Sequence, residues 1–209
     1  MKNLHLVLFL AAIFLGTIST FAQNSNFQKK QTVIKSVEKH QQELIALSDS
    51  IWGFAETALM EHKSSKLLAD YAEQRGFRVT RGVTDLPTAF IATYGSGKPI
   101  IGIMGEYDAL PGLSQKVQTS KESHMPSAAG HGCGHNMFGP GSLGAAIAIK
   151  ELMEAGQLSG TIRFYGTPAE EDLAGKVYTA RAGLFDDLDV CLDCPPFTKM
   201  KLICKVHKL

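Results

Sequence analysis

A cysteine and a histidine stand two residues apart in a glycine-rich segment, at Cys133 and His135. A thiolate and an imidazole are ligands that suit Zn²⁺, and Mn²⁺ becomes suitable where carboxylates join them. In an extended segment, residues two apart point the same way, and the glycines beside them let the backbone approach an ion closely. The segment therefore predicts a metal site, with an ordinary glycine-rich turn as the alternative. His131 lies in the same run and fits either a residue that supports a ligand or a surface residue.

Two adjacent glutamates, Glu170 and Glu171, provide carboxylates further along the chain. Because neighbouring side chains diverge, one carboxylate can bind a metal while the other faces the attacking water. This division suits metal-assisted hydrolysis, in which the second carboxylate takes a proton from the water and later donates it to the leaving amine. A solvated acidic loop or a helix N-terminus, where carboxylates are favoured, is the alternative.

Asp108 follows a short apolar run, two residues after Glu106, at the expected end of a strand. Its carboxylate could there accept the free N–H of a ligating imidazole and so orient that ligand. A turn-forming aspartate ahead of Pro111 is the alternative. These acidic and His/Cys segments belong to separate elements, so the fold must bring them together.

The expected elements alternate between helices and strands. Apolar residues recur at helical spacing from 30 to 52, and the apolar run at 100–104 is typical of a central strand buried on both faces. The alternation predicts an α/β fold with a largely parallel sheet that helices cover on both faces. Ligands bind such sheets at the carboxyl ends of the strands, where the acidic segments lie. The expected helices are 30–52, 64–76, 141–155 and 175–182, and the expected strands are 77–80, 88–94, 99–104, 161–165 and 189–193.

The composition is that of a globular chain. The 209 residues are 44% hydrophobic and 20% charged with a formal net charge of +1, which argues against a disordered chain or one that binds nucleic acid. At the N-terminus Lys2 precedes an apolar run at 4–15, and small residues follow at 20–22. This pattern predicts a secretory signal peptide at 1–22 and a mature chain that is exported, periplasmic or secreted. A retained membrane anchor is the alternative.

Three segments, 105–111, 132–136 and 168–171, resemble the successive motifs of a known family. It is the amidohydrolase branch of the aminoacylase and glutamate-carboxypeptidase superfamily of metallopeptidases. The resemblance implies that Cys133, His135 and Glu171 are metal ligands, that Glu170 is the general base and that Asp108 orients the metal site. It also implies a divalent metal, Zn²⁺ or Mn²⁺, with two ions in the complete enzyme.

Members of this family hydrolyse the amide bond between an acyl group and an amino acid. The resemblance therefore implies a metal-dependent amidohydrolase whose small-molecule substrates are N-acyl or p-aminobenzoyl amino acids, such as p-aminobenzoyl-glutamate. No nucleic-acid partner and no stable membrane span after signal cleavage are expected. A homodimer or a partner subunit is implied for the full-length protein only.

The chain departs from the family pattern near its C-terminal end. Members carry a Trp-His-Pro segment whose histidine completes the second metal site, whereas this chain reads Asp193-Cys194-Pro195-Pro196, and proline cannot bind a metal. We therefore expect a partial catalytic domain at 23–196, followed at 197–209 by an atypical tail from a truncated or frameshifted gene. The alternative function is an inactive fragment that binds a metal or a partner subunit without catalysis.

Overall fold

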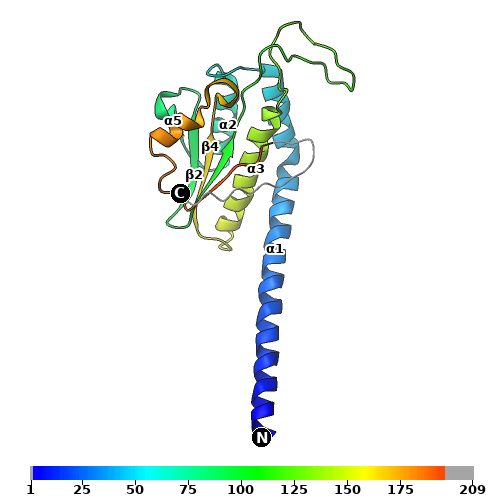
Figure 1. Ribbon diagram of the computed structural model, residues 1–209, viewed down its shortest axis with the longest axis vertical. Coiled ribbons are helices and arrows are strands. Elements are labelled where there is room, and N and C mark those ends of the chain that lie inside the picture. Colours follow the sequence, from blue (N-terminus) through cyan, green and yellow to red (C-terminus); the bar gives the residue numbers. More distant parts are fainter. Residues whose placement is uncertain (1, 196–209) are drawn as a thin grey trace.

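The computed structural model describes residues 2–195 as a mixed α/β body from which a long N-terminal helix projects (Figure 1). The predicted tail at 197–209 lies outside the described residues. The predicted signal peptide at 1–22 overlaps the first helix, α1 (Lys2–Phe54), and its cleavage stays a prediction. Among the residues that the structure describes, we find no helix that is both long and apolar enough to cross a bilayer.

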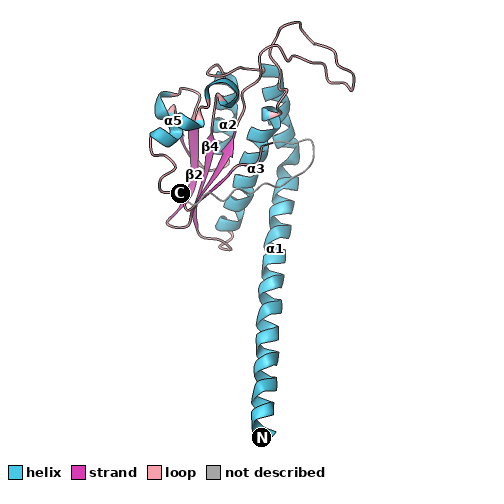
Figure 2. Ribbon diagram, viewed as in Figure 1, coloured by secondary structure: helices cyan, strands magenta, loops and turns pink. Residues whose placement is uncertain are grey.

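Helices and strands alternate along the chain as the sequence predicts (Figure 2). All five predicted strands are present, with bounds shifted by one or two residues. After α1 the elements are α2 (His62–Gln74), β1 (Arg78–Arg81), the 3₁₀ helix η1 (Val83–Asp85), β2 (Phe90–Ser96), β3 (Ile100–Gly105), α3 (His135–Glu154), β4 (Gly160–Gly166), α4 (Glu170–Leu173), α5 (Lys176–Arg181) and β5 (Val190–Leu192).

The helix predicted at 141–155 begins earlier than predicted, because α3 starts at His135 and contains Pro140. Local propensity disfavours helix there, since proline removes a backbone hydrogen bond. Close packing outweighs this cost. A Cβ on Gly139 would lie 2.8 Å from the carbonyl oxygen of Glu106, so the glycine lets the first turns of α3 lie against the end of β3.

The strands form one sheet in the order β1-β2-β4-β3-β5. β3 pairs in parallel with both β4 and β5, so the strand predicted at 99–104 has the expected interior position. β2 runs antiparallel to both of its neighbours, because the chain reverses direction at each end of this strand. Four of the five strands consequently point the same way, which confirms a largely parallel sheet.

Helices cover one face of the sheet, and the segment after α5 covers part of the other. On one face α2 and α3 pack against the strands, and α1 lies along α3 (Figure 1). On the other face the segment that follows α5 covers β4, where the Tyr165 hydroxyl donates to the Leu184 carbonyl at 2.8 Å and Arg163 pairs with Asp187. Phe164 points the opposite way into the main core. That core includes Leu68, Ala72, Phe90, Ile103, Leu143, Ile147, Ile162 and Phe164.

The contact between α1 and α3 fixes the C-terminal half of α1 to the body. His40 Nε2 lies 2.9 Å from Glu151 Oε1. Leu44 occupies the space beside Gly144, where a Cβ would come within 2.7 Å of its Cδ1. The absence of a side chain at Gly144 therefore allows the two helices to approach closely.

We expect Ile147→Ala to lower the free energy of unfolding by about 2–5 kcal/mol, because Ile147 is 2% exposed and its truncation leaves a cavity. Urea unfolding followed by circular dichroism measures the change. The matched control is Ile34→Ala on α1, which should change stability by less than about 0.5 kcal/mol because Ile34 is 49% exposed. Equal losses in the two variants would contradict this description of the core.

Candidate metal centre

The candidate site lies at the carboxyl ends of β3 and β4, as expected for a sheet of this kind. The two strands pair in parallel and end in register, with Gly105 opposite Gly166. The acidic segments that follow them therefore leave the sheet side by side. The first turn of α3 packs against the end of β3, and it brings His135, with Cys133 just before the helix, to the same place.

His135 is the centre of the site and is 1% exposed. Its Nδ1 lies 2.9 Å from Asp108 Oδ1, and its Nε2 lies 2.9 Å from Glu106 Oε2. Glu171 Oε1 is 3.8 Å from Nδ1, and Glu170 Oε2 is 3.8 Å from Nε2. Carboxylates thus face both nitrogens of the imidazole. The nitrogen that binds an ion determines which carboxylates can bind the same ion.

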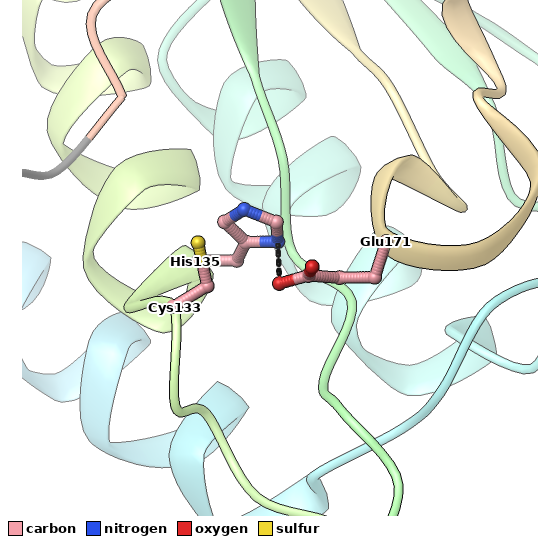
Figure 3. A group of neighbouring side chains, drawn as sticks. All are labelled: Cys133, His135 and Glu171. Carbon is pink, nitrogen blue, oxygen red and sulfur yellow. Dashed lines mark ion pairs between the residues drawn. The ribbon is translucent and has the colours of Figure 1, made fainter.

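Glu170 and Glu171 diverge, as the sequence predicts. They begin the short helix α4, and each approaches a different nitrogen of His135. The side chain of Glu170 is 41% exposed, whereas that of Glu171 is 14% exposed. Figure 3 shows Glu171 reaching from α4 toward His135, with Cys133 on the other side of the ring. One carboxylate is therefore open to solvent while the other lies inside the cluster.

Cys133 and His135 approach each other by a different geometry from the predicted one. Gly134 between them adopts a left-handed backbone with φ 88° and is the N-cap of α3. The prediction of an extended segment from Cys133 to His135 is therefore wrong. Glycine takes this conformation without steric cost, so the chain turns directly from Cys133 into the helix that His135 begins.

Asp108 connects the histidine to the acidic helix. It is 1% exposed, and its Oδ1 accepts a hydrogen bond from His135 Nδ1. Its Oδ2 accepts the backbone N–H of Glu171 at 2.9 Å. Asp108 thus has the geometry expected of a residue that orients an imidazole ligand.

Glu106 and Lys176 also belong to the cluster, although no motif assigns them a role. Glu106 is 3% exposed and contacts His135 through one oxygen and the Lys176 ammonium through the other. The position of Glu106 directly after a buried strand is a signal that could have found it. Lys176 gives no such signal, because a lysine at the start of a short helix is ordinary in a sequence.

His131 lies outside the cluster. It is 4% exposed, which rules out a surface position. Its Nε2 lies 3.0 Å from the carbonyl oxygen of Ile51, and its ring contacts Trp52 with centroids 6.3 Å apart. These contacts assign His131 to the packing between the end of α1 and the glycine-rich segment.

Burial and neighbouring charges set the protonation of the metal-free site. Burial alone disfavours the imidazolium, but the hydrogen bond and the charge of Asp108 raise the pKa of His135 to about 9. Burial raises the pKa of the Cys133 thiol despite the opposing charge of His135, and burial also raises the pKa of Glu170. At neutral pH an incoming metal ion must therefore displace protons from both His135 and Cys133.

The cluster fits a divalent metal ion. One ligand atom from each of Cys133, His135 and Glu171 lies within 4.8 Å of the others, and Glu106, His135 and Glu170 form a second such group. Glu171 Oε1 is buried and has no hydrogen-bond partner within the described part of the chain. A buried acceptor without a donor is costly, and a cation would satisfy it. A thiolate, an imidazole and a carboxylate together suit Zn²⁺.

Comparison with known proteins places this geometry in a family context. The model of peptidase family M20/M25/M40 matches residues 102–200. One of the subunits of the p-aminobenzoyl-glutamate hydrolase of Escherichia coli (strain K12) is 44% identical over 162 residues, which cover 77% of this chain and 34% of that protein. The Xaa-Arg dipeptidase of Homo sapiens is 31% identical over 181 residues, which cover 77% of this chain and 37% of that protein. The chain spans about a third of the length of these curated relatives.

A solved structure shares the fold. The crystal structure of a dinuclear metal-binding peptidase of family M20 from Bacillus subtilis superposes with a TM-score of 0.66 at 23% identity. The match covers 77% of this chain and 44% of that one. This chain therefore shares the arrangement of sheet and helices of that structure.

The chain thus shares the fold of that peptidase, and it carries a cluster of thiol, imidazole and carboxylate groups at the ends of β3 and β4. The segment 102–200, which matches the model of peptidase family M20/M25/M40, contains all the residues of both candidate ligand groups. Most of this chain is similar to part of the Escherichia coli hydrolase subunit. These findings confirm the resemblance that the three motifs indicate.

In the metal-free protein, Asp108→Asn should lower the pKa of His135 from about 9 toward 6.5, because the amide carries no negative charge. Titration of the histidine ring signals by NMR, after treatment with a chelator, measures this shift. Because the folded-state pKa is raised, the stabilisation from Asp108 is complete below about pH 6.5 and is lost as the pH rises through about 9. Asp49→Asn, at an exposed position on α1, is the matched control. An unchanged pKa in Asp108→Asn would refute the electrostatic account.

Proposed function

We propose that this chain is a metal-dependent amidohydrolase that cleaves the amide of N-acyl or p-aminobenzoyl amino acids, p-aminobenzoyl-glutamate among them. The convergence of Cys133, His135 and Glu171 beside a second carboxylate, Glu170, carries this proposal. The similarity to the Escherichia coli hydrolase subunit supports the substrate class. The related peptidase of Bacillus subtilis is described as a dinuclear metal-binding protein, and this supports a divalent metal here.

Cys133, His135 and Glu171 would hold the ion, which we propose to be Zn²⁺ or Mn²⁺. When bound, such an ion polarises the scissile carbonyl and lowers the pKa of the attacking water. The chain itself prepares the site, because Asp108 holds both the imidazole of His135 and the backbone N–H of Glu171. Two of the three ligands are thereby fixed before an ion arrives.

Glu170 is the general base of the proposed reaction. Its side chain is 41% exposed at the open side of the cluster, where a substrate and a water molecule can reach it. Burial raises its pKa, which makes the carboxylate a better proton acceptor. It would take a proton from the attacking water and donate that proton to the nitrogen of the leaving amino acid.

Glu106 and Lys176 control the charge around His135. The carboxylate of Glu106 lies 2.9 Å from His135 Nε2 and would otherwise leave an excess of negative charge in a buried position. The Lys176 ammonium pairs with the other oxygen of Glu106 and balances it. This pair lowers the electrostatic cost of the buried carboxylates, while Glu170 stays open to solvent.

A partner subunit and export to the periplasm or the medium complete the proposal. The relative from Escherichia coli is named as a subunit of a hydrolase, which supports assembly with a second subunit. The charged and apolar pattern at residues 1–22 supports export. Both belong to the proposal for the full-length protein.

Glu170→Gln should keep the metal but lower turnover of p-aminobenzoyl-glutamate by at least about 100-fold, because the amide cannot take a proton. Metal content by mass spectrometry and release of p-aminobenzoate measure the two effects separately. Cys133→Ala should bind the metal more weakly and should lose the activity. Glu38→Gln, at an exposed position on α1, is the matched control and should behave like the wild type.

Two results would contradict this account in different ways. Wild-type turnover in Glu170→Gln would refute the assignment of the general base. A metal-loaded wild-type chain that hydrolyses neither p-aminobenzoyl-glutamate nor any of a panel of N-acyl amino acids would refute the catalytic proposal. That chain would instead bind metal without catalysis.

A further inference from the structure

Glu61 is a fully buried carboxylate that no motif in the sequence assigns to the site. It stands at the N-cap of α2 and is 0% exposed. Burial disfavours the charged carboxylate and so raises its pKa. Hydrogen bonds from the surrounding protein must offset this cost. The partners that supply those bonds are informative.

The carboxylate of Glu61 does not cap its own helix. The structure gives α2 no side-chain hydrogen bond from its N-cap. The free N–H groups at the start of α2 donate instead to Glu56, at 3.0 Å from Lys63 and 2.9 Å from Ser64. Capping, the common reason for an acidic residue at a helix start, therefore does not explain Glu61.

One oxygen of Glu61 holds the turn that carries the two catalytic-site glutamates. Its Oε1 accepts the backbone N–H of Ala169 at 2.9 Å, across 108 residues of sequence. Ala169 is completely buried and has a left-handed backbone with φ 58°, which is unfavourable for a residue with a Cβ. The next two residues are Glu170 and Glu171, so the conformation of Ala169 sets the direction in which α4 begins.

The other oxygen of Glu61 connects to the acidic segment after β3. Its Oε2 accepts a hydrogen bond from the Thr88 hydroxyl at 3.0 Å. The carbonyl oxygen of Thr88 in turn accepts the hydroxyl of Tyr107, which is fully buried. Tyr107 lies in sequence between Glu106 and Asp108, so this chain of bonds ends in the middle of the segment that holds His135.

We propose that Glu61 is a positioning residue for the candidate metal centre. Its carboxylate joins the turn at Ala169 to the segment around Tyr107 and so fixes Glu171 relative to His135. This inference rests on the proposed function, because it takes the cluster to be a metal site. It adds a residue that contacts neither the ion nor the substrate. Mutation of residues that orient ligands in this indirect way commonly lowers metal affinity by about 10- to 100-fold, and we expect an effect of this order here.

Co²⁺ is the probe that tests the proposal, because its visible and near-ultraviolet absorption reports the ligands and their geometry as well as the affinity. Glu61→Ala should bind Co²⁺ about 10- to 100-fold more weakly than the wild type and with an altered absorption spectrum. Glu61→Gln should retain most of the affinity. Its amide oxygen can accept the Ala169 N–H while its NH₂ group donates to a rotated Thr88 hydroxyl.

Leu152→Ala is the control for a purely structural effect. Leu152 is 2% exposed near the C-terminal end of α3, so its truncation destabilises the fold at a distance from the cluster. Folded Leu152→Ala should show the wild-type Co²⁺ spectrum and affinity. Circular dichroism identifies the conditions in which each variant is folded.

Thr88→Val provides a second test that does not depend on the stability of Glu61→Ala. It removes the donor to Glu61 Oε2 with almost no change of shape and should weaken Co²⁺ binding severalfold. Wild-type affinity and spectrum in folded Glu61→Ala, or in Thr88→Val where Glu61→Ala does not fold, would overturn the proposal. Absence of Co²⁺ binding by the wild type would overturn the proposed function itself, which is a separate result.

Discussion

The parallel pairing of β3 with β4 ends in register, with Gly105 opposite Gly166, and this constraint determines where each carboxylate of the site lies. Side chains that follow the two strands leave the sheet at the same level and on neighbouring paths. The start of α3 reaches this edge only because Gly139 allows its backbone to touch the Glu106 carbonyl. A loss of register or a bulkier residue at that contact would separate the imidazole from the acids.

The second constraint is electrostatic. Glu106 and Asp108 are almost completely buried, and Glu171 is close to them, so their like charges repel one another in a medium of low dielectric constant. His135 and Lys176 supply the positive charge that makes this arrangement tolerable in the metal-free protein. A divalent ion would take over that task from the proton on His135. The same acids that require compensation when the site is metal-free would then serve as ligands or orient them.

The sequence predicts which residues gather in the cluster better than it predicts how they are held. Cys133, His135, Glu170, Glu171 and Asp108 are recognisable because the three ordered segments that contain them together resemble the motifs of a known family. The turn at Gly134 and the early start of α3 are not recognisable, since packing against β3 overrides local propensity. The order of the strands is likewise set by tertiary pairing, which brings β4 between β2 and β3.

Contacts that are distant in sequence explain the remaining omissions. Lys176 matters only because α5 lies close to Glu106, 70 residues earlier in the chain. Glu61 matters only because its carboxylate reaches Ala169, 108 residues later. Neither residue type nor spacing encodes such a contact, so a single sequence cannot reveal it.

The proposal that Cys133, His135 and Glu171 hold a divalent metal ion is the central claim, and X-ray absorption spectroscopy of the zinc-loaded protein tests it directly. For the zinc-loaded wild type the account predicts one sulfur neighbour at about 2.3 Å, with nitrogen and oxygen neighbours near about 2.0–2.2 Å and scattering typical of an imidazole. The sulfur neighbour should be absent from Cys133→Ala. A wild-type spectrum with oxygen and nitrogen alone, or a sulfur neighbour that persists in Cys133→Ala, would contradict the assignment of the site.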